Sequence, residues 1–180
     1  MRRVIRYIKL YGLQRTITKV LGRLRLKFPL WLILFFPYYR RKGKKVAIIG
    51  CGHQAYSSVS FYLSINTNSK IIGVYDINKS AAESLAVAYK SQYVSLDDLL
   101  SKKELKADLV YICTNHATHA NLALKFLEIG CDIFIEKPIC VNKKELVELS
   151  KSVKNNNSQN VFAGYNRPLS PAIRKIKENK

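Results

Sequence analysis

A short apolar run closed by glycines constrains this chain more than any other segment. Val46 to Ile49 has the pattern of a buried strand, and Gly50, Gly52 and Ala55 follow it as G-x-G-x-x-A. In a strand–turn–helix unit the first glycine permits a tight turn, the second lets the backbone approach a pyrophosphate, and the small third residue lets the helix pack on the strand. The N–H groups at the helix start then face the anion. The run therefore predicts a dinucleotide-binding βαβ unit.

An acidic residue ends the next predicted strand, over residues 70–76. Asp76 follows Gly52 by 24 positions, close to the spacing of about 20 expected for a carboxylate that accepts ribose hydroxyls. The competing interpretation is that Asp76 only begins a turn or caps the next helix. Because Asp76 follows the glycine turn by one βα unit, we favour the interpretation that its carboxylate binds the ribose. A carboxylate repels a 2′-phosphate, so NAD is predicted over NADP, although Lys79 nearby leaves NADP as an alternative.

From residue 45 onward, apolar strand-like runs alternate with helical patterns. We expect strands at 46–49, 70–76, 107–113, 131–135 and 161–164, with helices between them at about 54–63, 80–90, 120–129 and 142–154. Such alternation predicts an α/β fold, a doubly wound and mostly parallel sheet of the Rossmann type. The expected organisation is a basic arm over 1–44, a dinucleotide-binding domain over 45–168 and the start of a second domain over 169–180.

The loop after the third predicted strand runs from Thr114 to His119. It lies outside the carboxyl end of a strand, where open α/β sheets bind their ligands. The histidines His116 and His119 are three residues apart, which could suggest a metal pair, but no third ligand is evident. We favour cofactor contacts and helix capping, and predict no metal site.

The basic charge of the chain is concentrated at its N-terminus. Of 31 Lys and Arg residues, 14 fall in the first 45 positions, which contain no Asp or Glu. The first 27 residues predict one amphipathic helix with an apolar face. The residues on that face are Leu13, Ile17, Val20, Leu21 and Leu24. The aromatic run at 28–39 is shorter than the ~20 residues of a membrane span and lacks the cleavage pattern of a signal peptide.

Several partners remain open for this arm. A basic helix joined to an aromatic segment suits the surface of an anionic membrane. The alternative is packing against its own domain or against a partner subunit, which would make a homo-oligomer. Nucleic acid is the least favoured partner. The four cysteines form no CxxC pair, so we expect reduced thiols and a cytoplasmic protein, with peripheral attachment at the inner membrane as a variant.

The ordered motifs GCGHQA, CTNHATHANLAL, FIEKP and AGYNRPLSP, with the strand ending in Asp76, resemble the Gfo/Idh/MocA family. That family contains NAD(P)-dependent oxidoreductases of sugars, cyclitols and nucleotide sugars. The resemblance covers about residues 45 to 178, the family's N-terminal cofactor domain, and EKP is its most specific motif. The TNHxxHA-like and GxNRxxSP-like segments are most similar to the branch associated with bacterial surface-polysaccharide synthesis.

The resemblance implies a role for each matching residue. Lys137 of EKP would be the catalytic residue, reaching the nicotinamide ribose and the substrate hydroxyl, while the competing interpretation is an exposed loop lysine. Asn115 stands where many members have proline, and Pro168 where an arginine often follows Arg167. The implied cofactor-binding residues are Gly50, Gly52, His53, Gln54, Ala55, Asp76, Thr114, Asn115, His116, His119, Glu136, Lys137 and Arg167.

Members of the family also carry a second domain that binds substrate, and this chain stops at Lys180. We therefore expect the NAD(P)-binding part of an oxidoreductase acting on a sugar or nucleotide sugar, present as a fragment or truncated product. The alternative is a non-catalytic nucleotide-binding subunit or a membrane-associated assembly subunit.

Overall fold

The computed structural model describes residues 2–33, 43–66, 69–101, 106–155, 158–165 and 170–178. Its centre is one five-stranded sheet in the order β2-β1-β3-β4-β5, and every pair of neighbours is parallel. The strands are β1 (Lys44–Ile49), β2 (Ser69–Tyr75), β3 (Leu109–Ile112), β4 (Asp132–Ile135) and β5 (Val161–Ala163). The predicted doubly wound α/β fold is confirmed.

The strand order reverses between β1 and β3. β2 lies on one side of β1 while β3, β4 and β5 follow on the other, so a crevice opens at the carboxyl ends of β1 and β3. Outside β2, Tyr93 makes an isolated parallel bridge to Val74, which extends the sheet by one position. The predicted glycine turn and the loop at 114–119 both leave strands at this crevice.

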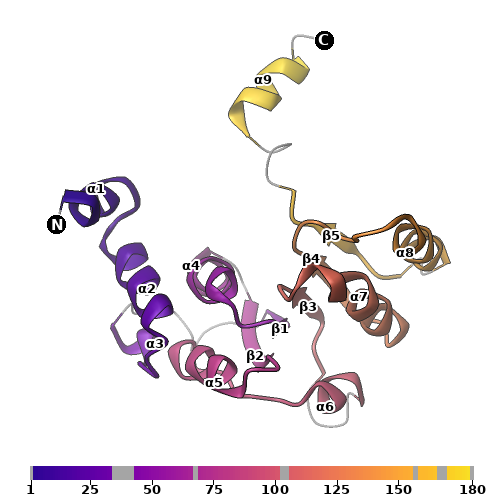
Figure 1. The fold of residues 1–180 in the computed structure, drawn as a ribbon, viewed down its shortest axis with the longest axis horizontal. Helices are drawn as coiled ribbons and strands as arrows, with labels where there is room; N and C mark the ends of the chain where they lie inside the picture. The colour runs from indigo at the N-terminus through magenta and orange to yellow at the C-terminus, as the bar shows by residue number, and fades with distance from the viewer. Residues whose placement is uncertain are drawn as a thin grey trace.

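Helices cover both faces of the sheet (Figure 1). Side chains alternate along β1, so Val46 and Ile48 join the core beneath one layer while Ala47 and Ile49 join the other. The first layer contains α4 (Ser60–Asn66) and α5 (Lys79–Ala88), and the second contains α6 (Leu96–Ser101), α7 (His119–Glu128) and α8 (Lys143–Asn155). Burial on both faces explains the continuous apolar runs of these strands.

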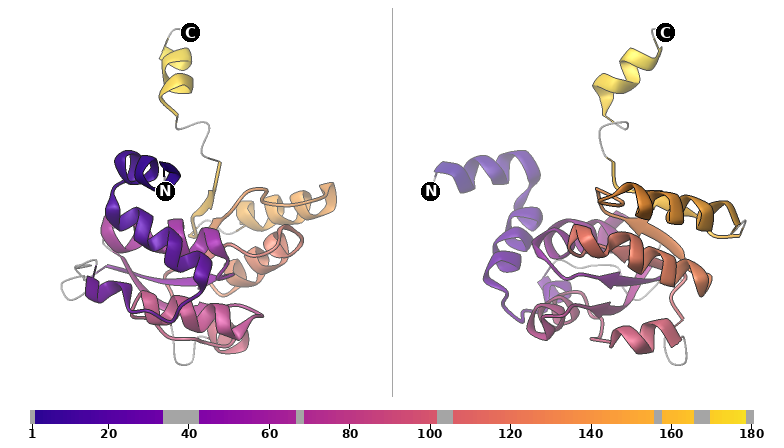
Figure 2. Two further views of the ribbon diagram at one scale, coloured as in Figure 1. Left: turned by 60° about the vertical axis from the view of Figure 1, so that its left-hand side comes forward. Right: turned by 45° about the vertical axis from the view of Figure 1, so that its right-hand side comes forward.

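The N-terminal arm forms α1 (Arg2–Tyr11), α2 (Leu13–Leu24) and α3 (Leu30–Ile33). The prediction of one helix over the first 27 residues is wrong, because Gly12 separates two helices at a φ of +83°. That backbone conformation is readily available to glycine and cannot continue a right-handed helix. In two views α1 lies at the outer end of the arm, while α2 and α3 lie beside the first helical layer (Figure 2).

The face of α2 that packs on the domain differs from the predicted apolar face. Thr18 and Gly22 are buried, whereas Leu13, Val20 and Leu24 are 60%, 46% and 61% exposed. A Cβ at Gly22 would lie 2.6 Å from a ring carbon of Tyr56, so the helix approaches the domain too closely for larger side chains on that side. Leu21 and Ile17 lie at the edge of the contact and pack against the same core. An exposed apolar row therefore faces away from the domain.

The last described helix, α9 (Pro171–Glu178), stands apart from the sheet in Figures 1 and 2. Arg167 and Pro168 lie outside the described residues, as does the second half of the aromatic run at 28–39, residues 34–39. Within the described ranges, no helix has the length and apolar character needed to cross a membrane.

Candidate cofactor site

Gly50 closes the turn after β1 in a position that excludes a side chain. Its φ is +88°, and a Cβ there would lie 2.6 Å from the carbonyl carbon of Cys113 and 2.7 Å from the amide nitrogen of Thr114. The N–H of Gly50 donates to the carbonyl of Tyr75 at 2.8 Å. The turn is thus pressed against the loop that follows β3, as a tight turn at the strand-order reversal requires.

Gly52, in contrast to Gly50, has open space where a side chain would lie. No heavy atom lies within 4 Å of the place its Cβ would take, and the residue is exposed. A ligand phosphate can therefore approach the backbone N–H groups at the start of the following helix. Ala55 is fully buried against the first helical layer. The open space at Gly52 fits a dinucleotide pyrophosphate.

The helix that leaves this turn begins as a π-helix, η2 (Ala55–Val59), before becoming α4. The N–H of Ser60 bonds to the carbonyl of Ala55, five residues earlier. The carbonyl of Tyr56 accepts the hydroxyl of Tyr89, the residue that follows α5, at 2.6 Å. The helix predicted at 54–63 therefore has a widened, π-helical first part that a tertiary hydrogen bond joins to the end of α5.

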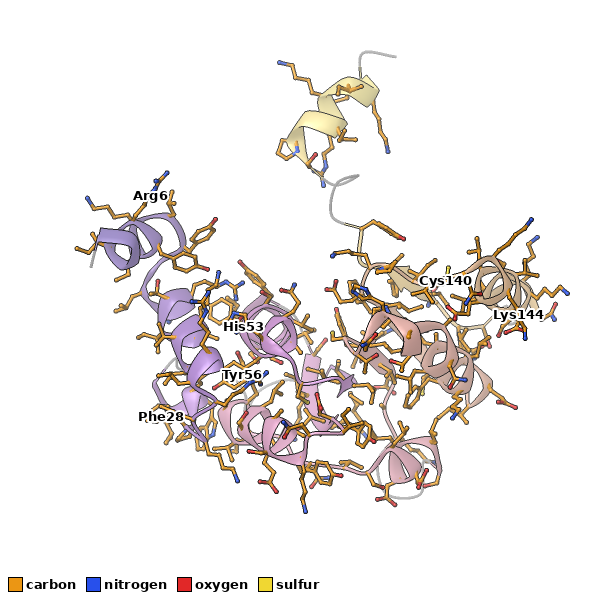
Figure 3. All side chains as sticks on the ribbon, viewed as in Figure 1. Arg6, Phe28, His53, Tyr56, Cys140 and Lys144 are labelled. Carbon is orange, nitrogen blue, oxygen red and sulfur yellow. The ribbon has the colours of Figure 1, made fainter. Side chains whose placement is uncertain are left out.

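His53 and Gln54 occupy the first turn after Gly52. Gln54 is exposed and His53 half-buried, with its Nε2 3.4 Å from the hydroxyl of Ser57. Burial lowers the pKa of His53, and the cations of α2 and its C-cap lower it further, against a backbone interaction with Gly22 that raises it. His53 lies on the side of η2 that faces α2 (Figure 3). Its imidazole is therefore neutral at physiological pH.

Asp76 connects the end of β2 to the glycine turn. Its Oδ2 accepts the N–H of Cys51 at 2.6 Å, and its Oδ1 accepts the N–H of Asn78 at 2.8 Å. The helix cap itself is Asn78, whose side chain accepts the N–H of Ala81. Each carboxylate oxygen retains a free lone pair for a ribose hydroxyl. Asp76 thus both begins a turn and fits the ribose role.

The loop after β3 is held by its own side chains. Asn115 accepts the N–H of Ala117 at 3.1 Å through its Oδ1, and the hydroxyl of Thr118 donates to the carbonyl of Asn115 at 2.8 Å. Asn115 has φ −66° and ψ 142°, the values that a proline would adopt. The replacement of proline by Asn115 therefore keeps the extended backbone at this position.

His119 ties this loop to the loop after β4. Its ring is buried, with Nδ1 2.7 Å from the carbonyl oxygen of Pro138 and Nε2 3.1 Å from that of Thr114. The exposed His116 ring lies 5.6 Å from the His119 ring. The described parts of the chain contain no group of three or more His, Cys, Asp or Glu residues placed to hold a metal. His119 is thus a structural link between two predicted cofactor loops.

Glu136 and Lys137 follow β4 at the same edge of the sheet. The N–H of Glu136 donates to the carbonyl of Ile112 at 3.0 Å, and a Cβ at Gly164 would lie 3.2 Å from the Cα of Glu136. Lys137 is exposed, and its peptide bond to Pro138 is cis. The backbone of the motif is therefore fixed, while the ammonium group extends into solvent.

A cavity of about 670 Å³ lies at the carboxyl ends of β1 to β3. Its lining residues are Ile49, Gly50, Gly52, Tyr75, Asp76, Ile77, Leu96, Cys113, Thr114, Asn115, Ala117, Thr118, Asn121, Leu122 and Lys125. Five of the cofactor-binding residues predicted from the sequence line this cavity, namely Gly50, Gly52, Asp76, Thr114 and Asn115. His53, Gln54, Ala55, His116, His119, Glu136 and Lys137 are not among its lining residues.

Several cavity residues escaped the sequence prediction. Ile77 directly follows Asp76 and is 93% exposed, and Leu96 and Leu122 add apolar surface opposite the polar turn. Such walls suit the flat faces of an adenine ring. Asn121, Leu122 and Lys125 recur on one side of α7, so their helical spacing was the available signal.

The cysteines near the site are free. Burial raises the pKa of Cys51, and the Asp76 charge raises it further. Burial, with the Glu136 charge, raises the pKa of Cys113 to about 12. Both groups are therefore thiols rather than thiolates at neutral pH.

Comparison with known proteins finds one family whose match covers the whole described sheet. Residues 44–165 match the family model GFO_IDH_MocA, described as an oxidoreductase family with an NAD-binding Rossmann fold. Inositol 2-dehydrogenase from Rhizobium meliloti (strain 1021) is 33% identical over 116 residues, which are 63% of this chain and 34% of that protein.

Solved structures share the fold. A candidate myo-inositol dehydrogenase from Sinorhizobium meliloti 1021 aligns with a TM-score of 0.67 at 28% identity, covering 76% of this chain and 41% of that one. The myo-inositol dehydrogenase from Lactobacillus casei, in complex with NAD(H) and myo-inositol, aligns with a TM-score of 0.68 at 22% identity and the same coverage. The chain thus spans between a third and about two fifths of the length of these relatives.

Proposed function

Because the chain belongs to the GFO_IDH_MocA oxidoreductase family, whose matched domain is an NAD-binding Rossmann fold, we propose that it forms the cofactor-binding part of an oxidoreductase acting on a sugar or nucleotide sugar. NAD, the predicted cofactor, agrees with the family. The observation that carries the proposal is the open backbone at Gly52 beside the carboxylate of Asp76. These two features fit the pyrophosphate and the adenosine ribose of one dinucleotide.

Lys137 is the residue we assign to the chemical step. NAD, when bound, would supply the hydride acceptor for a carbinol carbon. The exposed ammonium group of Lys137, on a loop fixed through Pro138 to the buried His119, would stabilise negative charge on the substrate oxygen. Glu136 holds the same loop against β3 through its backbone.

The substrate class follows from the relatives. Inositol 2-dehydrogenase acts, by its name, on a cyclic polyol, and a sugar or nucleotide sugar presents the same kind of ring hydroxyl. The AGYNRPLSP and CTNHATHA segments support a place in bacterial surface-polysaccharide synthesis. Free, largely buried thiols support a cytoplasmic location.

Calorimetry with the 180-residue chain tests the cofactor assignment. We expect NAD to bind, and Gly52→Val to weaken binding by at least tenfold without changing the melting temperature, because its side chain fills only open space. Absence of NAD binding by the folded wild-type chain overturns the proposal.

NAD is preferred to NADP in this proposal because Asp76 faces the ribose position. The ammonium of nearby Lys79 lies over the Tyr93 ring, 5.4 Å from its centre. We expect Asp76→Ser to reduce the preference for NAD over NADP in competition binding, while Asp97→Ser on α6 leaves it unchanged. An unchanged preference in Asp76→Ser contradicts this assignment.

The alternative is a subunit that binds the dinucleotide without turnover. Steady-state assays of NAD reduction with myo-inositol, simple sugars and UDP-sugars separate the two functions. Turnover that Lys137→Met abolishes supports the enzyme, whereas NAD binding without turnover by the chain supports the binding subunit.

We also propose that the arm lies on an anionic membrane surface. The supporting observation is the apolar row of α2, Leu13, Val20 and Leu24, which faces away from the domain. The first 45 residues add 14 cations and no acidic side chain. An apolar row among cations matches a helix seated at the headgroup level of an anionic bilayer.

Vesicle co-sedimentation tests this surface. The double variant Leu13→Gln/Leu24→Gln should lose most binding to vesicles that contain an anionic lipid, while Leu146→Gln, at an exposed position of α8, should retain it. Equal sedimentation of both variants, or binding to zwitterionic vesicles alone, contradicts the proposal.

A further inference from the structure

The arm reaches the candidate cofactor site through Arg25. This residue caps α2 in the left-handed conformation, with φ 54° and ψ 30°, and its N–H donates to the carbonyl of Leu21. Its Nη1 donates to the carbonyl oxygen of Cys51 at 2.6 Å. Cys51 stands between Gly50 and Gly52, so a side chain from outside the matched residues 44–165 holds the glycine turn itself.

Cys51 is held through both of its peptide groups. Its N–H donates to Asp76 at 2.6 Å, and its carbonyl accepts from Arg25. The residue is fully buried, so a carbonyl without the guanidinium would be a buried acceptor lacking this charged donor. The two bonds fix the path of the turn from opposite sides.

The position of Arg25 is itself fixed by the packing of α2 on η2. Gly22 lies against the Tyr56 ring, and Arg15 donates to the hydroxyl of Ser58 at 2.8 Å. The guanidinium carbon of Arg25 lies 5.9 Å from the centre of the Tyr56 ring. In Figure 3, His53 and Tyr56 both lie between η2 and the arm. The helix therefore presents Arg25 to the turn in a defined place.

We propose that Arg25 is a positioning residue for the pyrophosphate-binding turn, which makes the N-terminal arm part of the cofactor site. The inference rests on the proposed NAD binding. Arg25 does not need to touch the ligand, because it acts by holding the Cys51 carbonyl. The N–H groups of the turn are then already arranged for a phosphate, and binding does not bear the cost of ordering them.

Three variants of the full chain test this role by calorimetry with NAD. Arg25→Met, which keeps the length of the side chain but has no donor, should raise the dissociation constant about tenfold, as expected for a lost charged hydrogen bond. Arg25→Lys, which keeps a cationic donor, should restore most of the affinity. Arg23→Met removes the same charge from an exposed position on α2 and should change affinity by less than about twofold. Equal weakening by Arg23→Met and Arg25→Met would show a general charge effect and overturn the proposal.

Amide hydrogen exchange in the ligand-free protein gives an independent readout. Arg25→Met should accelerate exchange at Cys51, Gly52 and His53 while leaving the strand β4 unchanged. Failure of wild-type chain to bind NAD would refute the proposed function, and exchange would still decide whether Arg25 holds the turn. Unchanged exchange in Arg25→Met, or loss of the entire fold in that variant, contradicts a positioning role.

Discussion

Two glycines of the same turn have different physical requirements. Gly50 meets protein backbone on the side where a Cβ would point, whereas Gly52 faces open space. The pattern G-x-G does not distinguish these cases, because both positions are written with the same letter. In the structure, backbone contacts require glycine at position 50, whereas at position 52 a ligand could occupy the open space.

Alanine substitutions should separate the two requirements. Gly50→Ala should lower the free energy of unfolding by at least about 2 kcal/mol, since it adds left-handed strain and a clash with the Cys113 carbonyl. Gly52→Ala should stay within roughly 0.5 kcal/mol of wild type. Urea unfolding measures both. A destabilised Gly52→Ala protein would argue against open space at that position.

His53 predicts a pH dependence of stability. Burial holds its folded-state pKa below the unfolded value, so the unfolded chain takes up the proton more readily. The stability of the wild type should therefore fall as pH decreases through the unfolded pKa of about 6.5, and should not be affected by this group above it. Urea unfolding at about pH 8 and about pH 5.5 should show a smaller loss in His53→Gln than in wild type.

The exposed His116 provides the control for this measurement. His116→Gln makes the same substitution at an exposed position, in the loop after β3. If His53→Gln and wild type lose the same stability over this interval, burial of His53 is not the cause.

At the scale of whole elements, the contact of α2 with η2 depends on Gly22. Alanine usually stabilises a helix relative to glycine by up to about 1 kcal/mol. Here the added Cβ would lie 2.6 Å from the buried Tyr56 ring, so Gly22→Ala should instead lower the free energy of unfolding by about 1–3 kcal/mol.

The control for Gly22→Ala is Gln14→Ala, at an exposed position of α2, which should be close to neutral. Thermal and urea unfolding compare the two. Equal stability of the two variants would show that Tyr56 moves aside without cost.

The strands were predictable because both of their faces are buried. Val46–Ile49 and Ile133–Ile135 read as apolar runs, and that signal is local. The face of α2 that packs on the domain was not predictable. Sequence periodicity identifies the face with the largest apolar side chains, whereas the helix packs through the side where it approaches the domain most closely, at Gly22. The π-helical start was not predicted either, and its Tyr56 carbonyl accepts a hydrogen bond from Tyr89, 33 positions away in the sequence.

The candidate site likewise contains residues that the local sequence predicts and one that only tertiary packing reveals. Gly50, Gly52 and Asp76 could be predicted because their spacing along the chain reflects one βαβ unit. Arg25 could not, because its bond to Cys51 joins residues 26 positions apart through the packing of a separate helix. The basic composition of the arm left a membrane surface and packing against its own domain both open, and no local sequence pattern shows which cationic side chain contacts the domain.

At the scale of the whole molecule, the N-terminal arm packs against the first helical layer and shares its core. Leu30 of α3 is fully buried, and Phe28, Ile17 and Trp31 pack against the same core. Lys27 also pairs with Glu83 of α5 at 2.6 Å. The arm is therefore joined to the sheet by apolar contacts as well as by surface charge.

Deletions should reveal how much of the arm the fold requires. Removing residues 1–11 should change the melting temperature little, since α1 lies at the outer end of the arm (Figure 2). Removing residues 1–33 should cost on the order of 5 kcal/mol, because it takes Leu30 and Trp31 out of the core. Calorimetric melting compares the two, and equal stability of both products would place the arm outside the cooperative unit.

The burial of Leu30 also bears on how the chain is made. Its packing partners in α5 (Lys79–Ala88) are synthesised about 50 residues later, which takes several seconds at ordinary translation rates of about 5–20 residues per second. The apolar side chains of the arm emerge from the ribosome before the surface that will cover them exists. During that interval these side chains are exposed, in a segment whose first 45 residues carry 14 cations and no acidic side chain.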